Sequence, residues 1–214
     1  MMSTSVAAIE RDIFIHPQAL VECDSIGPGT RIWAFAHVMD GAKVGALCNI
    51  CDHAFIEAGA IVGNHVTIKN GVAIWDGVTV EDDVFLGPNC VLTNDLNPRA
   101  IRRKTRVELL ETRIGANATI GANATIVCGV TIGRGAFIGA GTVVVRSIPD
   151  FALVVGNPAR QTGWMCACGQ KLQLAVAAPM HATVSCKSCR REFLVQKSGL
   201  AVCAYPAPGT KEVL

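Results

Sequence analysis

Aromatic residues are scarce in this 214-residue sequence: they make up 5% of it, and only one is a tyrosine. A β-sandwich usually fills its core with more rings, so the scarcity favours a narrow interior of isoleucine and valine. The formal net charge of +2 indicates neither nucleic-acid binding nor an acidic tail. No apolar run approaches the roughly 20 residues of a membrane helix, and residues 1–12 lack the apolar core of a signal peptide. We therefore expect a cytoplasmic protein that binds neither nucleic acid nor membrane.

A large apolar residue recurs at every sixth position, from Phe14 to Leu92 and again from Ile114 to Val144. From Thr30 onward a smaller residue usually stands four positions after each large one, and glycine often follows the large residue directly. Alternating large and small inward side chains fit the flat faces of a coil, and glycine fits its tight corners. The repeat predicts an all-β fold, a parallel β-helix with three hexapeptides per triangular coil and coils about 4.8 Å apart. A generic β-sandwich is the alternative.

The repeat is interrupted once, by residues 93–113, and it ends before a segment of different composition. Insertions into repeat proteins form surface loops that often carry function, so we expect an excursion loop here. After Gly163 the sequence carries a cysteine-bearing module. We predict a β-helix domain over residues 1–162, a small module resembling a zinc ribbon over 163–200 and a loose C-terminus over 201–214.

The excursion loop is strongly basic. Its cations are Arg99, Arg102, Arg103, Lys104 and Arg106. Such a cluster can clamp the phosphates of a ligand, or it can be a solvated charge run that binds nothing. The first interpretation predicts that Arg99, Arg102 and Arg103 bind the substrate.

Residues eighteen positions apart should lie above one another in a triangular coil. This spacing stacks Glu57 with Trp75, and Asp76 with Asn94, directly beside the basic loop. We therefore expect Glu57, Trp75 and Asp76 to line a polar substrate pocket with one aromatic wall. Packing of Trp75 against a second subunit is the alternative.

Four of the ten cysteines form two close pairs, Cys166 with Cys168 and Cys186 with Cys189. The second pair has the spacing of a zinc knuckle, whereas the first is one residue shorter. A module this small cannot be held together by its core alone, so we predict a structural Zn²⁺ bound by four thiolates. Free thiols on a flexible tail, or two disulfides, are the alternatives. The remaining cysteines are scattered, which suits a reducing cytosol.

Several stretches of the repeat region resemble one known family. They are residues 68–78, 85–89, the run Thr-Asn-Asp-Leu-Asn-Pro-Arg at 93–99, and the closing run 154–160 with its Gly-Asn-Pro-Ala-Arg. These stretches resemble hexapeptide-repeat acyltransferases, and within them the N-acetyltransferases of nucleotide-linked 3-amino sugars that serve O-antigen (lipopolysaccharide) and surface-glycan synthesis. The resemblance covers about residues 14–165. It implies a left-handed parallel β-helix, a homotrimer with sites between subunits, acetyl-CoA as co-substrate and a dTDP- or UDP-linked amino sugar as acceptor.

The resemblance also implies roles for individual residues. Asn94 matches the asparagine that hydrogen-bonds the reacting amine, and Asp95 follows it in the same loop as a second catalytic candidate. Arg160 would meet the phosphates of CoA, with Asn157 from the same closing run. The remaining CoA contacts, to the pantetheine arm, would come from the backbone of Gly121, Gly139 and Ala140.

The excursion loop contains no histidine. Many related enzymes use a histidine there as the base for a hydroxyl nucleophile; an alcohol needs such a base, whereas a neutral amine does not. The missing histidine therefore favours N-acetylation by direct transfer in a ternary complex. The alternatives are a sugar O-acetyltransferase, a non-catalytic scaffold, and a zinc hydratase of the carbonic anhydrase type, which needs three convergent histidines.

Overall fold

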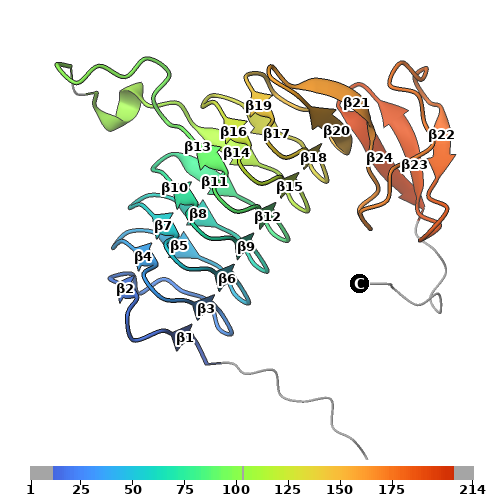
Figure 1. Cartoon of the computed structure of the whole chain (residues 1–214). Coiled ribbons are helices and arrows are strands. Elements are labelled where there is room, and N and C mark those ends of the chain that lie inside the picture. Colours follow the sequence, from blue (N-terminus) through green and yellow to red (C-terminus); the bar gives the residue numbers. More distant parts are fainter. Residues whose placement is uncertain (1–11, 103, 205–214) are drawn as a thin grey trace, which may run out of the picture.

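The computed structural model describes residues 12–102 and 104–204, and Figure 1 shows a column of short strands followed by a smaller antiparallel sheet. The elements are β1 (Phe14–Ile15), β2 (Leu20–Val21), β3 (Arg31–Ile32), β4 (His37–Val38), β5 (Lys43–Val44), β6 (Asn49–Ile50), β7 (Phe55–Ile56), β8 (Ile61–Val62), β9 (Thr67–Ile68), β10 (Ala73–Ile74), β11 (Val78–Val80), β12 (Phe85–Leu86), β13 (Val91–Leu92), η1 (Arg106–Glu108), β14 (Thr112–Ile114), β15 (Thr119–Ile120), β16 (Thr125–Ile126), β17 (Thr131–Ile132), β18 (Phe137–Ile138), β19 (Val143–Val144), β20 (Ala152–Val155), β21 (Arg160–Trp164), β22 (Thr183–Ser185), β23 (Glu192–Gln196) and β24 (Gly199–Ala204).

Strands of successive coils pair in parallel and form the three faces of a β-solenoid. The first face is a sheet in the order β1-β3-β6-β9-β12-β15-β18-β20, to which β21 adds antiparallel. The second face holds β2-β4-β7-β10 and then β13-β16-β19, and the third holds β5-β8-β11-β14-β17. In the regular coils each residue pairs with the one eighteen positions later, as Asn49 does with Thr67. The parallel β-helix predicted from the six-residue period is confirmed.

The interior of the solenoid is filled by the large residues of the six-residue period. Ile50, Ile68 and Ile74 are each 0% exposed, and the smaller residues that follow, such as Ala54 and Ala60, are buried beside them. Complete burial of an isoleucine side chain contributes about 1.5–3 kcal/mol. This column of aliphatic side chains therefore stabilises the coils and holds their corners in place.

The predicted phase of the period is wrong in the first coil. Phe14 and Leu20 were expected to face inward, but they pair with Arg31 and His37, the residues just before the buried Ile32 and Val38. Phe14, Ile15 and Leu20 are all exposed at this end of the solenoid. The first coil is one residue shorter than the regular eighteen: Phe14 pairs with Arg31, seventeen positions on. A shift of one residue moves every side chain of a strand to the opposite face. Ile15 therefore pairs with the inward-facing Ile32.

The excursion loop leaves the column after β13 and returns at β14 (Figure 1). It contains the 3₁₀ turn η1, whose first turn is closed by a 3.0 Å hydrogen bond from the backbone N–H of Thr105 to Glu108 Oε2. The chain rejoins the stack in register, because Val78 pairs with Thr112 and Val80 with Ile114. Within the described residues, no helix is both long and apolar enough to cross a membrane.

The C-terminal module is the antiparallel sheet of β22, β23 and β24 at the end of the column (Figure 1). Its central side chain, Phe193, is 0% exposed. The strand β24 reaches Ala204, so the sheet continues past residue 200, where the sequence predicts the end of the module. Residues 205–214 of the predicted loose C-terminus, and residues 1–11, lie outside the described residues.

Candidate functional site

Four of the residues predicted for the substrate site meet at one corner of the solenoid. The backbone N–H of Asp76 donates to Glu57 Oε2 at 2.8 Å, and Asn94 Nδ2 lies 3.4 Å from the carbonyl oxygen of Asp76. Trp75 precedes Asp76 on the same coil. The eighteen-residue columns therefore bring Glu57, Trp75, Asp76 and Asn94 together, as the spacing predicts.

The Trp75 side chain is fixed from two sides. Its indole Nε1–H donates to the carbonyl oxygen of Leu92 at 2.7 Å, and its ring lies 5.6 Å from the ring of Phe55, centroid to centroid. The residue remains partly exposed. Trp75 is therefore bonded through its indole N–H to one neighbouring coil and packed through its ring on another.

Arg106 reaches from the excursion loop to the coil and forms an ion pair with Asp76, Nε to Oδ2, at 2.9 Å. The other carboxylate oxygen of Asp76, Oδ1, is buried and accepts no hydrogen bond from any described residue. Gly59 leaves room for this pair: a Cβ atom there would overlap Asp76 Oδ1 and lie 2.8 Å from Nη2 of Arg106. The corner thus combines a fixed cation with an acceptor that has no protein donor.

A cavity of about 260 Å³ lies between the coil and the excursion loop at this corner. Its lining residues are Asp76, Gly77, Arg106, Val107, Leu109 and Glu111. The coil contributes Asp76 and Gly77, and the loop contributes both charged and apolar side chains. Glu57 and Trp75, which the sequence predicts to line a substrate pocket, do not line this cavity.

Asp95, predicted as catalytic, is engaged inside the excursion loop. Its Oδ1 pairs with Lys104 Nζ and accepts a 2.9 Å hydrogen bond from the backbone N–H of Asn97. The hydrogen bond from Lys104 lowers the pKa of Asp95 below its ordinary value. Asp95 is therefore held as a carboxylate that braces the loop.

The other predicted loop cations are separated. Arg102 pairs with Glu108 at 2.7 Å within the loop. Arg99 is exposed and joins Arg102 only through a backbone bridge. Arg103 lies outside the described residues. Among the described cations of the loop, Arg106 is the one that forms an ion pair with the coil at the candidate pocket.

Two residues of this corner, Gly59 and Arg106, were not among the residues predicted to bind the substrate. The sequence contains a signal for Gly59. Gly41, Gly59 and Gly77 recur every eighteen residues and all adopt positive φ, so a glycine column marks this corner. Arg106 belongs to the basic run of the predicted phosphate clamp, but the irregular loop gives no period that would single it out from the other cations.

The five residues predicted to bind CoA lie at a different corner, the one after the strands of the first face. Gly121 follows β15, Gly139 and Ala140 follow β18, and Asn157 lies in the turn after β20, which ends at Arg160, the first residue of β21. The coils touch here: a Cβ atom on Gly121 would lie 2.5 Å from the backbone nitrogen of Ala140. Both Asn157 and Arg160 are exposed.

The two predicted half-sites do not meet within one chain. Asp76 follows β10 on the second face, whereas Gly139 follows β18 on the first. Each corner of a triangular coil faces a different direction. The residues predicted for the substrate therefore lie at one corner and those predicted for CoA at another.

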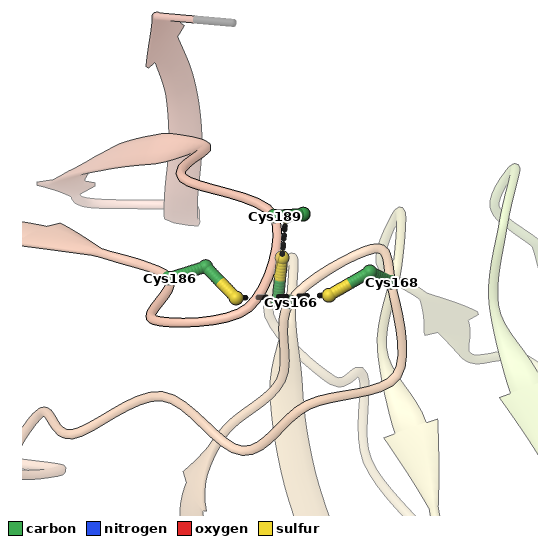
Figure 2. Close-up of side chains that lie close together, drawn as sticks. All are labelled: Cys166, Cys168, Cys186 and Cys189. Carbon is green, nitrogen blue, oxygen red and sulfur yellow. Dashed lines mark hydrogen bonds between the residues drawn. The ribbon is translucent and has the colours of Figure 1, made fainter. Parts of the chain in front are cut away.

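Figure 2 shows the side chains of Cys166, Cys168, Cys186 and Cys189 gathered at one point of the C-terminal module. The Sγ atoms of Cys166 and Cys189 are 3.4 Å apart, those of Cys168 and Cys186 are 3.6 Å apart, and all four lie within 4.8 Å of one another. In the described part of the chain, this is the one group of three or more histidine, cysteine or acidic side chains that can converge on a metal. It contains no histidine, so the three-histidine set of a hydratase is not formed among the described residues.

The thiol of Cys186 has a lowered pKa. Burial raises its pKa, but hydrogen bonds from the backbone N–H groups of Cys189 and Ser188, and from the neighbouring thiols, outweigh this effect and lower the pKa to about 7. N–H donors directed at sulfur favour the thiolate, which is the form that binds a metal.

Comparisons with known proteins agree with this architecture. The family model described as bacterial transferase hexapeptide (six repeats) matches residues 59–94 and 111–146, the coils on both sides of the excursion loop. The dTDP-3-amino-3,6-dideoxy-α-D-galactopyranose 3-N-acetyltransferase of Aneurinibacillus thermoaerophilus is 53% identical over 166 residues, which are 75% of this chain and 82% of that protein.

Two solved structures illustrate more distant similarity. A mutant of perosamine N-acetyltransferase from Caulobacter crescentus, in complex with CoA and GDP-perosamine, is 28% identical with a TM-score of 0.45. That match covers 71% of this chain and 56% of that one, so this chain spans just over half of its length. A mutant of AntD, an N-acyltransferase from Bacillus cereus in complex with dTDP and CoA, is 20% identical with a TM-score of 0.48, covering 70% and 79%. With 53% identity over most of a curated relative and two blocks of matching repeats, the chain belongs to the bacterial transferase hexapeptide family.

Proposed function

We propose that this protein transfers the acetyl group of acetyl-CoA to the 3-amino group of a dTDP-linked 3-amino-3,6-dideoxyhexose. The observation that carries the proposal is the 53% identity across 82% of an enzyme with that activity. The absence of histidine from residues 93–113 supports an amine acceptor over a hydroxyl acceptor. The dTDP of the relative favours dTDP over UDP as the nucleotide.

The corner around Asp76 suits the sugar nucleotide. Arg106 supplies a fixed positive charge beside the cavity, as a diphosphate requires. Asp76 lines the cavity, and its carboxylate can accept a hydrogen bond from a sugar hydroxyl or from the amine. Asn94 lies next to Asp76 to orient the amine.

The proposed reaction is a direct transfer in a ternary complex. The neutral amine attacks the thioester carbonyl, a C–N bond forms and the C–S bond breaks. The departing CoA sulfur takes the amine proton, so the products are the amide and CoA thiol. Because Asp95 is occupied by Lys104, the mechanism assigns it to the loop structure and uses no separate base.

We also propose that the active enzyme is a homotrimer, with each site formed between two subunits. Support comes from the separation of the two half-sites, since the substrate residues and the CoA residues occupy different corners of one chain. A neighbouring copy that presents its CoA corner to the Asp76 corner completes the site. This arrangement predicts trimers in light scattering and inactive monomers.

A mixing experiment tests the shared site. Asn94→Ala disables the substrate half and Arg160→Ala weakens the CoA half. Coexpression in mixed trimers should restore part of the activity, because some interfaces then combine two intact halves. Trimers of either single variant are the controls. If mixed trimers are no more active than the average of the two controls, each site lies within one subunit.

The activity itself is tested by thiol release from acetyl-CoA with a panel of dTDP- and UDP-linked sugars that carry an amine or a hydroxyl at C3. We expect turnover with the dTDP-linked amine. Asn94→Ala should lower kcat by about 30- to 1,000-fold, equivalent to about 2–4 kcal/mol for one transition-state contact, with little change in acetyl-CoA affinity. Preferential turnover of the hydroxyl sugar would support O-acetylation, and a covalent acetyl-enzyme on the pathway would contradict direct transfer.

We further propose a place for the enzyme in the cytoplasmic synthesis of O-antigen or a related surface glycan. Nucleotide-linked sugars are the activated donors of such polymers. All ten cysteines are unpaired, which supports a reducing compartment. Loss of the N-acetylated sugar from the surface glycan of a deletion strain, with accumulation of the nucleotide-linked amine, is the expected outcome.

A further inference from the structure

We propose that Cys166, Cys168, Cys186 and Cys189 bind one Zn²⁺, and that the zinc-bound module caps the C-terminal end of the β-solenoid. The inference is independent of the acetyl transfer proposed above, because it rests on a different part of the chain. It has two parts, the metal site and the cap, and each has its own observations.

The sulfur atoms are spaced for a metal and not for disulfides. A tetrahedral site with Zn–S bonds of about 2.3 Å places neighbouring sulfurs roughly 3.8 Å apart. The closest sulfur pairs here are 3.4 and 3.6 Å apart, and no two ligand atoms are more than 4.8 Å apart. A disulfide requires about 2.05 Å. All four thiols are unpaired.

The two cysteine loops have the same backbone design, although the first has one residue fewer. In each loop the residue after the second cysteine adopts positive φ: Gly169 at +82° and Arg190 at +61°. Each of these residues donates its N–H to the carbonyl oxygen of the first cysteine at 2.9 Å, Gly169 to Cys166 and Arg190 to Cys186. The shorter Cys-Ala-Cys spacing therefore still forms a closed turn that directs both sulfurs to one point (Figure 2).

The module is joined to the last coil by packing and by backbone hydrogen bonds. The rings of Phe151, from the last coil, and Phe193, from β23, meet edge to face with centroids 5.1 Å apart, and both are almost fully buried. Asp150 donates its N–H to Ser198 at 2.9 Å and accepts from Leu200 at 3.1 Å. The approach is close enough that a Cβ atom on Gly199 would overlap the backbone of Asp150.

These contacts cover the end of the aliphatic column. The terminal coil of a solenoid exposes its core and an unpaired strand edge unless another element covers them. Here β21 pairs with β20, and its buried Trp164 leads directly into Cys166. One cysteine pair thus continues from the solenoid strand, while the other comes from the loop between β22 and β23. A metal bound by both pairs ties the module to the solenoid.

Metal analysis tests the first part. Full-length protein purified with reductant and without chelator should contain about one zinc per chain. Cys186→Ser should lose it, whereas the matched control Cys203→Ser, which removes an exposed thiol of the same module, should keep it. Wild-type protein loaded with Co²⁺ should show thiolate-to-cobalt charge-transfer and tetrahedral d–d bands, a readout that needs no variant. Iron in place of zinc, a Cys166–Cys189 disulfide in the reduced preparation, or full zinc in Cys186→Ser would overturn the assignment.

Hydrogen exchange tests the cap. Removal of zinc from the wild-type protein should speed exchange at least tenfold in β22–β24 and at the amides of Asp150, Met165 and Leu200, which bond across the junction. Strands β3–β9 serve as the internal control and should not change. In zinc-loaded Phe193→Ala the metal should remain while the junction amides lose protection. If zinc removal loosens the module and leaves the Asp150 and Met165 amides protected, zinc stabilises only the module. The proposal that the zinc-bound module caps the solenoid is then wrong.

Discussion

Replacement of Arg106 by alanine should weaken binding of the sugar nucleotide far more than it weakens the fold. The Arg106 side chain is 73% exposed and pairs with a single carboxylate, so its contribution to stability is that of a surface ion pair, below about 1 kcal/mol. A charge-assisted hydrogen bond to a diphosphate contributes about 1.5–3 kcal/mol. We therefore expect the KM for the sugar nucleotide to rise about ten- to hundred-fold, with the KM for acetyl-CoA unchanged.

Arg102→Ala is the matched control, because it removes the same charge from the same loop but from a residue that pairs with Glu108 and not with the coil. Steady-state kinetics at two salt concentrations separate a specific contact from general attraction, since the latter weakens with ionic strength. Gly59→Ala should raise the KM in the same direction, because the added methyl group displaces the pair of Arg106 and Asp76. Equal effects of Arg102→Ala and Arg106→Ala, or an unchanged KM in both, would refute the assigned role of Arg106.

Three further predictions follow from the described contacts. Ile74→Ala should lower the free energy of unfolding by about 2–5 kcal/mol in denaturant titrations, whereas the control Ile61→Ala, at a position 43% exposed, should cost much less. Because the folded pKa of Asp95 is lowered, its pairing with Lys104 stabilises the loop above the unfolded pKa of about 3.9 and is lost as the pH falls through the folded value. Limited proteolysis should show the loop opening there, with no such step in Asp95→Asn. Burial raises the pKa of Cys90 to about 12, so alkylation at pH 8 should label Cys203 and spare Cys90.

The fold was predictable because the coils repeat the same pattern of large and small apolar residues. A large residue such as Ile50 and a small one such as Ala54 decide which side of the strand faces inward, and this decision needs no information from distant parts of the chain. The stacking of Asp76 under Asn94 followed from the same arithmetic. The spacing therefore predicted that Glu57, Trp75, Asp76 and Asn94 lie together at one corner.

The phase of the first coil and the ion pairs of the excursion loop were not predicted correctly, for physical reasons. In the first coil both Phe14 and Ile15 are apolar, so either could be the inward-facing large residue of the repeat. The coil is seventeen residues long, and this length pairs Ile15 with the inward-facing Ile32. In the excursion loop each cation has several acidic residues within reach. Composition alone cannot decide that Lys104 pairs with Asp95 while Arg106 pairs with Asp76. Irregular backbone has no period from which such pairs can be computed.

The return of the chain in register has a consequence for how this protein can change. Val78 pairs with Thr112, 34 positions on, where a regular coil would need eighteen, so the excursion adds sixteen residues and the chain still rejoins the third face in register. On the second face the sheet is divided between β10 and β13, the strand from which the loop leaves. Substitutions, deletions or grafts within residues 95–110 can therefore alter which ligand the corner accepts, while the aliphatic column that holds the corner together stays the same. The loop can therefore change in sequence and length while the solenoid that carries it keeps its structure.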